Sequence, residues 1–186
     1  MTTAESGAFS TAALEEYLSL IDELLAQPFP ETSYDDVTGH GGPGHRVRVL
    51  RVSRDFWDDD DGRALHEADT EMQAHLDALT TVFTTRWGDP LVVDLWSYLT
   101  AGYEGEAVPE PIDSLSQQAV SMQAWQFRDR GHWLALTIGQ WDKELPLELL
   151  AAVGRTAALD PNRCSYPASG PGSDLPHHLH QPLDPG

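Results

Sequence analysis

The C-terminal half of the sequence contains a hairpin pattern, and this feature constrains the fold more than any other. Two strand-like runs, residues 123–128 and 132–141, are separated by Asp129, Arg130 and Gly131. Turn-forming residues between two such runs are typical of antiparallel strands joined by a short connection. In the second run, apolar side chains occupy both alternating positions, as they do in a strand that is covered on both faces. We therefore expect an antiparallel sheet with residues 132–141 in a central strand.

Two more segments have strand patterns. Residues 46–53 alternate between polar and apolar side chains, but the alternation changes phase between Val49 and Leu50, where a β-bulge would restore it. Such a bulge would place the arginines of this segment on one face. Residues 91–99 are apolar enough to form an internal strand. The sheet is therefore expected to contain about four strands.

Three segments are predicted to be helical. Residues 10–27 carry apolar side chains at steps of three and four, and Pro28 ends the pattern. Residues 62–83 repeat this pattern, and the four aspartates that precede them can cap a helix and suit the positive end of its dipole. Residues 146–153 are typical of a short helix, with proline in the first turn and Gly154 just beyond the end.

Together these segments predict an α+β fold. It consists of a mostly antiparallel sheet of about four strands, with two longer helices and a short C-terminal helix packed on one face. A chain of 186 residues is long enough for one domain with tails. We expect a flexible N-terminus at 1–9, a single domain at 10–159, and a disordered tail at 160–186 that contains proline, glycine and histidine. Within the domain, residues 27–45 and 100–117 are expected to be loops.

The charge of the chain restricts its partners. Thirty acidic residues face only eleven lysines and arginines, which gives a formal net charge of −19. Such a charge repels nucleic acid and acidic membranes and attracts basic proteins. The single cysteine excludes an intrachain disulfide, and no apolar stretch is long enough to cross a membrane. We therefore expect a cytoplasmic protein with a basic protein partner, and neither nucleic acid nor membrane binding.

Familiar catalytic and metal-binding motifs do not occur in the sequence. We find no phosphate-binding loop and no nucleophile elbow. The aspartate run does not fit a calcium loop, because Trp57 and Ala68 occupy positions that require acidic ligands. His66, Glu71 and His75 lack the spacing of a zinc-binding helix. We therefore expect no cofactor and no metal site.

Aromatic and acidic side chains gather on the predicted strands and just after the last of them. Aromatic rings beside carboxylates are typical of a binding groove, although rings on adjacent strands also pack a sheet beneath its helices. Asp142 and Glu144 could act as a carboxylate pair, or they could cap the following helix. The residues predicted to contact a partner or ligand are Asp94, Trp96, Tyr98, Trp125, Trp133, Trp141, Asp142 and Glu144.

These observations lead to one functional hypothesis and two alternatives. The hypothesis is a non-catalytic cytoplasmic interaction module that presents an acidic surface to a basic partner. In size, charge and fold class such a chain resembles the immunity proteins of bacterial competition systems, which implies an immunity or inhibitor role. The first alternative is a small enzyme or ligand-binding protein with an acidic, aromatic-lined cleft. The second is a structural or adaptor subunit of a larger assembly.

Overall fold

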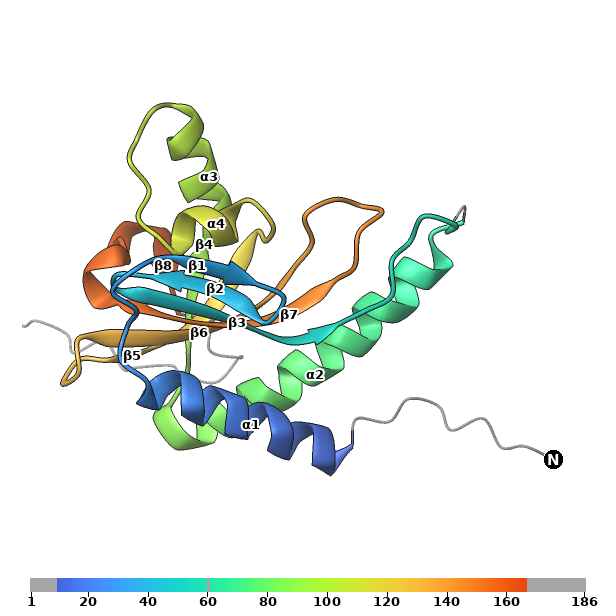
Figure 1. Ribbon diagram of the computed structural model, residues 1–186, viewed down its shortest axis with the longest axis horizontal. Helices are drawn as coiled ribbons and strands as arrows, with labels where there is room; N and C mark the ends of the chain where they lie inside the picture. Colours follow the sequence, from blue (N-terminus) through green and yellow to red (C-terminus); the bar gives the residue numbers. More distant parts are fainter. Residues whose placement is uncertain (1–9, 60, 167–186) are drawn as a thin grey trace, which may run out of the picture.

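An eight-stranded antiparallel sheet forms the centre of the protein and separates two layers of helices (Figure 1). The computed structural model describes residues 10–59 and 61–166. The strand order is β1-β2-β3-β7-β6-β5-β4-β8. The strands are β1 (Tyr34–Asp36), β2 (Gly39–Gly42), β3 (His45–Val52), β4 (Leu91–Asp94), β5 (Ser121–Phe127), β6 (His132–Gly139), β7 (Glu148–Arg155) and β8 (Cys164–Ser165). The prediction of about four strands was therefore wrong.

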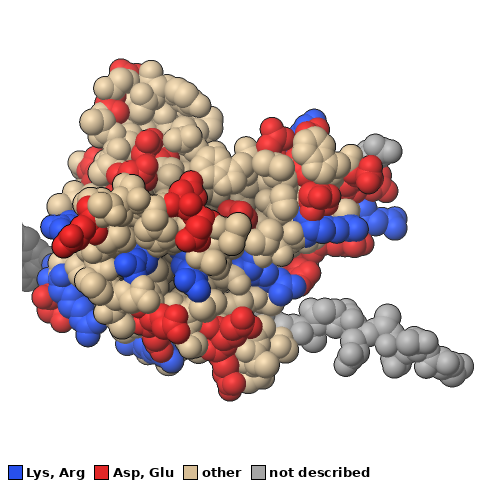
Figure 2. All heavy atoms as spheres, viewed as in Figure 1, with Lys and Arg blue, Asp and Glu red and all other residues tan. Residues whose placement is uncertain are grey.

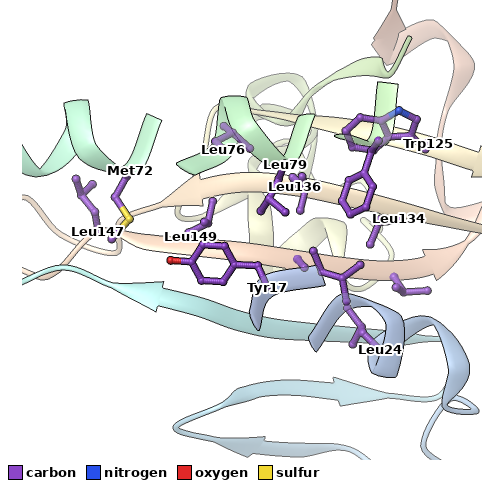
Figure 3. Packing of buried hydrophobic residues seen from close by; sticks show 14 of the residues in the cluster. Tyr17, Leu24, Met72, Leu76, Leu79, Trp125, Leu134, Leu136, Leu147 and Leu149 are labelled. Carbon is purple, nitrogen blue, oxygen red and sulfur yellow. The ribbon is translucent and has the colours of Figure 1, made fainter. Parts of the chain in front are cut away.

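The helices cover both faces of the sheet, and not the single face that the sequence predicted. Along β6, Leu134 and Leu136 join the core beneath one layer of helices, whereas Trp133 and Ala135 join the core beneath the other. The first layer consists of α1 (Thr11–Ala26) and α2 (Arg63–Trp87), and the second of α3 (Leu95–Tyr103) and α4 (Ile112–Ser116). Figure 3 shows the first core, with Tyr17, Leu24, Met72, Leu76, Leu79, Trp125, Leu134, Leu136, Leu147 and Leu149 labelled.

The two long helices form where the apolar periodicity predicted them. In α1, Tyr17, Ile21 and Leu24 are buried on one stripe, and the hydroxyl of Ser10 caps the helix by accepting a hydrogen bond from the backbone N–H of Ala13 (3.1 Å). At the start of α2, the carboxylate of Asp59 accepts hydrogen bonds from the backbone N–H groups of residues 64 and 65. The predicted capping by the aspartate run is thus confirmed for Asp59.

The predicted bulge in β3 is present. The register of the β3–β7 pairing shifts between Val49 and Arg51. On either side of the shift, Arg46 donates to Gln27 and to the backbone oxygen of Pro28, and Arg51 pairs with Glu71 of α2. The flanking arginines of the strand therefore both lie on the face that α1 and α2 cover.

Several boundaries differ from the prediction. Residues 146–153 do not form a helix, because 148–155 form β7, which pairs with β3 and β6 in the middle of the sheet. The strand predicted at 91–99 ends at Asp94, whose side chain caps α3. The loop expected at 27–45 contains β1 and β2, and the loop expected at 100–117 contains α4.

The segment predicted to be a disordered tail divides into two parts. Its first residues form a 3₁₀ turn, Pro161–Arg163, followed by β8, which pairs with β4. A preceding 3₁₀ turn, Thr156–Ala158, follows β7 directly. Residues 167–186 and the predicted flexible N-terminus 1–9 lie outside the described residues.

Candidate functional site

Several loops meet at one end of the sheet, which we call the loop end. Because the sheet is antiparallel, β3, β4 and β6 end there while β5 and β7 begin there. The loop end comprises residues 53–59, 61–62, 117–120 and 140–147, with Asp94 and the first residues of α2 and α3. In Figure 1, the loops after β3 and β6 project together at the right of the view.

Backbone hydrogen bonds hold these loops to one another. The N–H of Ser53 donates to the backbone oxygen of Leu147 (2.9 Å), and the N–H of Phe56 donates to that of Glu144 (2.9 Å). The N–H of Gln140 donates to the backbone oxygen of Gln118 (2.8 Å). The loop end is thus a connected surface in which the three segments constrain one another.

Three of the six tryptophans are exposed at the loop end. Trp57 and Trp96 are each 62 % exposed, and Trp141 is 50 % exposed. Trp57 lies in the loop after β3, Trp96 in the first turn of α3, and Trp141 in the loop after β6. Large aromatic side chains grouped on a surface mark interaction sites far more often than single exposed ones do.

Carboxylates lie on the same segments as these tryptophans. Exposed acidic residues of the loop end are Asp55, Asp58, Asp61, Asp94 and Asp142, and Glu144 is half-buried. The basic residues there are Arg54, Arg63 and Lys143. Figure 2 shows acidic side chains at the right-hand end of the viewed face next to a row of basic ones. Acidic groups therefore outnumber basic ones at this end.

The loop between β6 and β7 is shaped by its own polar groups. The carboxylate of Asp142 accepts a hydrogen bond from the N–H of Glu144 (3.3 Å), and the backbone oxygen of Asp142 accepts one from Leu145 (2.9 Å). The side-chain amide of Gln140 donates to the backbone oxygen of Leu145 (2.8 Å). Asp142 therefore stabilises a turn between two strands, and the helix that it was expected to cap does not form.

The structure brings together five of the eight residues that the sequence predicted as contacts. Asp94, Trp96, Trp141, Asp142 and Glu144 all lie at the loop end. The other three are Tyr98, Trp125 and Trp133, which are buried in the cores.

Each of the three buried aromatic residues has a structural role. The hydroxyl of Tyr98 accepts a hydrogen bond from the backbone N–H of Asp160 (2.6 Å). The indole N–H of Trp125 donates to the backbone oxygen of Gly88, and that of Trp133 to the backbone oxygen of Arg155, each at 2.9 Å. These rings anchor loops and strand ends to the sheet.

Sequence reasoning missed Trp57. It lies outside any periodic apolar pattern, so it was not counted with the aromatic residues of the strands. The available signal was its position beside a run of aspartates, in a segment too polar to be covered by a core.

A groove crosses the ends of β5 and β6 between α2 and α3, with a volume of about 550 Å³. Leu99, Val120 and Ile138 contribute apolar surface. Among the described residues that line it, Asp69 is the one carboxylate, and lysine and arginine are absent. We call it the glutamine groove, because its polar lining includes Gln73, Gln117, Gln118, Gln123 and Gln140, with Trp96 beside them.

Residues 10–59 and 61–166 contain no group of three or more histidine, cysteine, aspartate or glutamate side chains placed to hold a metal ion. In the same residues, no helix is both long and apolar enough to cross a membrane. No protein-family model, curated protein or solved structure matches this chain.

Proposed function

We propose that this chain is a protein-binding module that contacts a basic protein through the loop end. The observation that carries the proposal is that Trp57, Trp96 and Trp141 are all exposed at one end of the sheet, on segments that also carry carboxylates. Tryptophan is enriched among the residues that dominate binding energy at protein interfaces. Carboxylates around such anchors attract a basic surface and orient it during the encounter.

The hydrogen bonds of the loop end support this role. The side-chain hydroxyl of Ser53 accepts a hydrogen bond from the N–H of Leu147 (2.9 Å), in addition to the backbone bonds between these loops. Trp57 and Trp141 lie on these two connected segments. Surfaces that are already ordered lose less conformational entropy when they bind, so more of the contact energy becomes affinity.

The distribution of charge also supports the loop end as the contact surface. At the opposite end of the sheet, Arg128 and Arg130 lie in the β5–β6 turn, and Arg155 ends β7. A basic partner would be repelled from these arginines and attracted to the carboxylates of the loop end. A cytoplasmic inhibitor or immunity protein that covers the basic surface of its partner belongs to this functional class.

The proposal is tested by recovering the partner and measuring direct binding. The tagged full chain is used to co-purify proteins from its source cell, and each recovered protein is purified and titrated against the wild type and the double variant W57A/W141A. Each tryptophan contact is expected to contribute roughly 2 kcal/mol, so the double variant should bind several hundredfold more weakly.

The matched control is Tyr103→Ala, which removes an 84 % exposed aromatic side chain at the far end of α3. The affinity of Tyr103→Ala for the partner should equal that of the wild type. For both proteins, binding should weaken as the salt concentration rises. Wild-type affinity in W57A/W141A, or binding that is insensitive to salt, would contradict the proposal.

A further inference from the structure

The side chain of Gln118 is buried in the glutamine groove without a hydrogen bond to its amide oxygen. Gln118 is 8 % exposed, and within residues 10–59 and 61–166 its Oε1 has no partner. An unpaired polar atom in such a place costs roughly 1–3 kcal/mol, because water cannot replace the missing bond. A ligand that donated a hydrogen bond to this oxygen would recover that energy.

Gly139 allows the amide of Gln118 to occupy this position. A Cβ atom at residue 139 would lie 2.5 Å from Oε1 of Gln118 and 2.9 Å from its amide carbon. The amide therefore packs directly on the backbone of β6, and Gln118 and Gly139 both line the groove. The oxygen has almost no accessible surface in this position, so a donor reaches it only when the amide turns away from β6 and into the groove.

Two other glutamines of the lining already donate through their side-chain amides within the protein. The amide nitrogen of Gln73 donates to Asp77 (2.8 Å), and that of Gln140 donates to the backbone oxygen of Leu145 (2.8 Å). Among the residues that the structure describes, neither amide oxygen accepts a hydrogen bond, so each can accept one from a ligand. Gln123 has the opposite arrangement, since its oxygen accepts from the hydroxyl of Thr80 (2.7 Å).

The carboxylate of Asp69 adds negative charge to the lining, and the chain as a whole carries −19. The groove therefore favours a cation that donates several hydrogen bonds. Arginine matches this requirement, because its guanidinium has five N–H donors and no acceptor.

Trp96 supplies a further contact for such a cation. It lines the groove, and 62 % of its surface is exposed. A guanidinium stacks on the face of an indole ring more readily than an ammonium does. The groove volume of about 550 Å³ also lies within the range of small-ligand pockets, which leaves room for the backbone on either side of the arginine.

We infer that the glutamine groove binds an arginine side chain of the basic partner, with the guanidinium between the amide oxygen of Gln118 and the ring of Trp96. The inference that this arginine belongs to a partner protein rests on the proposed function. The preference of the groove for a guanidinium does not, and it can be measured on the isolated chain.

The test uses ¹H–¹⁵N spectra of the full chain titrated with N-acetyl-arginine amide. Saturable shifts are expected at the side-chain amide of Gln118 and at the indole N–H of Trp96. N-acetyl-citrulline amide, which has a neutral urea in place of the guanidinium, should bind at least tenfold more weakly. Equal binding of the citrulline probe, or of a neutral sugar such as glucose, would overturn the inference, as would the absence of a response to the arginine probe.

Variants locate the site. Gln118→Leu should weaken binding of the arginine probe by at least tenfold. Trp96→Ala, which removes an exposed side chain, should also weaken it. The control is Gln126→Leu. Gln126 lies in the same sheet, but at the far end of β5 and outside the groove. Wild-type affinity in both groove variants would overturn the inference even if the probe binds elsewhere on the acidic surface.

The two proposals fail in different ways. If W57A/W141A loses the partner but Gln118→Leu retains it, and the arginine probe does not bind, the arginine site is wrong and the loop end remains the contact. If the isolated chain prefers the arginine probe over citrulline but binds no basic protein, the groove is supported and the proposed partner is wrong.

Discussion

Trp133 shows how one side chain determines its neighbour in the sheet. It is the largest of the fully buried side chains, and its Cα partner on β7 is Gly154. A Cβ atom at residue 154 would lie 2.4 Å from Cζ2 of Trp133, which is too close for any side chain. The indole can therefore lie flat against β7 and donate to the backbone of Arg155 because residue 154 has no side chain.

Gly154→Ala is accordingly expected to destabilise the fold by roughly 1–3 kcal/mol, as overpacking of a dense core does. Urea denaturation followed by circular dichroism measures this. The control, Gly102→Ala, lies in α3 with only Val108 at an ordinary contact distance of 3.6 Å, and it should be neutral or stabilising by up to about 1 kcal/mol. Equal urea midpoints for Gly154→Ala and the wild type would show that β7 can move away from the ring.

At the residue scale, the sequence identified two of the three exposed tryptophans of the site, Trp96 and Trp141, but could not separate exposed from buried aromatic residues. Trp96 and Tyr98 are two positions apart, so a strand would place them on one face. In the helix α3, the same spacing turns them to nearly opposite sides, and Trp96 is exposed while Tyr98 is buried. The prediction of a strand therefore placed a buried residue, Tyr98, among the predicted contacts.

At the scale of elements, periodicity predicted helices well only where one side faces solvent. The helices α1 and α2 have an apolar stripe and a polar side, and their patterns were interpreted correctly. Residues 149–154 of β7 are buried on both faces, so their unbroken apolar run has no period of two. Such a run is typical of a buried strand and of a buried helix alike, and Pro146 and Gly154 favoured the wrong choice.

The start of α2 gives a prediction at the same scale. Gly62 occupies the N-cap position and has no side chain to cap the helix. Asp59 takes over this role through hydrogen bonds from the N–H groups of Ala64 (3.0 Å) and Leu65 (2.9 Å). Asp59→Ala should therefore lower the urea midpoint at neutral pH, whereas Asp58→Ala, at a neighbouring exposed carboxylate, should leave it unchanged.

The effect of Asp59 should depend on pH. The hydrogen bond from Leu65, followed by that from Ala64, lowers the pKa of this carboxyl below its ordinary value of about 4. The folded state thus binds the proton less readily than the unfolded state, so the stabilisation is present above pH 4 and is lost as the pH falls through the lowered pKa. Urea midpoints of wild type and Asp59→Ala should converge in acid, and a constant difference would contradict the assignment.

At the scale of the whole molecule, the order of the strands could not be predicted from the sequence. The central pairing of β3 with β7 joins segments separated by α2, α3, α4 and three strands, and no local pattern encodes such a contact. The same pairing brings the loops after β3 and β6 side by side and so builds the loop end. Some residues of the candidate site could therefore be predicted from the sequence. The way in which the fold brings them to one end of the sheet could not.

The net charge of −19 does not show where on the molecule the acidic side chains lie. Carboxylates lie at the loop end, but others lie along α1, as Glu15, Glu16 and Glu23 do. Figure 2 shows acidic side chains at separate places on the viewed face, with basic ones between them. Net charge alone therefore does not identify the contact surface, and an experiment has to compare two acidic regions at equal total charge.

Two triple variants make this comparison, since each removes three negative charges. Asp55→Asn, Asp58→Asn and Asp61→Asn change the loop end, and Glu15→Gln, Glu16→Gln and Glu23→Gln change α1. If a basic partner docks at the loop end, the first triple should lower its association rate constant by about tenfold and flatten the dependence on salt. The second should change the rate constant by less than about twofold at physiological salt, where charges beyond roughly 8 Å are screened.

Stopped-flow mixing with the co-purified partner measures both rate constants. Asparagine retains a side-chain oxygen, so Asp61→Asn can still accept the hydrogen bond that the N–H of Arg63 donates to it, and the loop should keep its conformation. Equal losses in the two triple variants would mean that net charge controls the encounter and that the loop end does not direct it. A loss confined to the loop-end triple would assign the steering to the same surface that carries Trp57, Trp96 and Trp141.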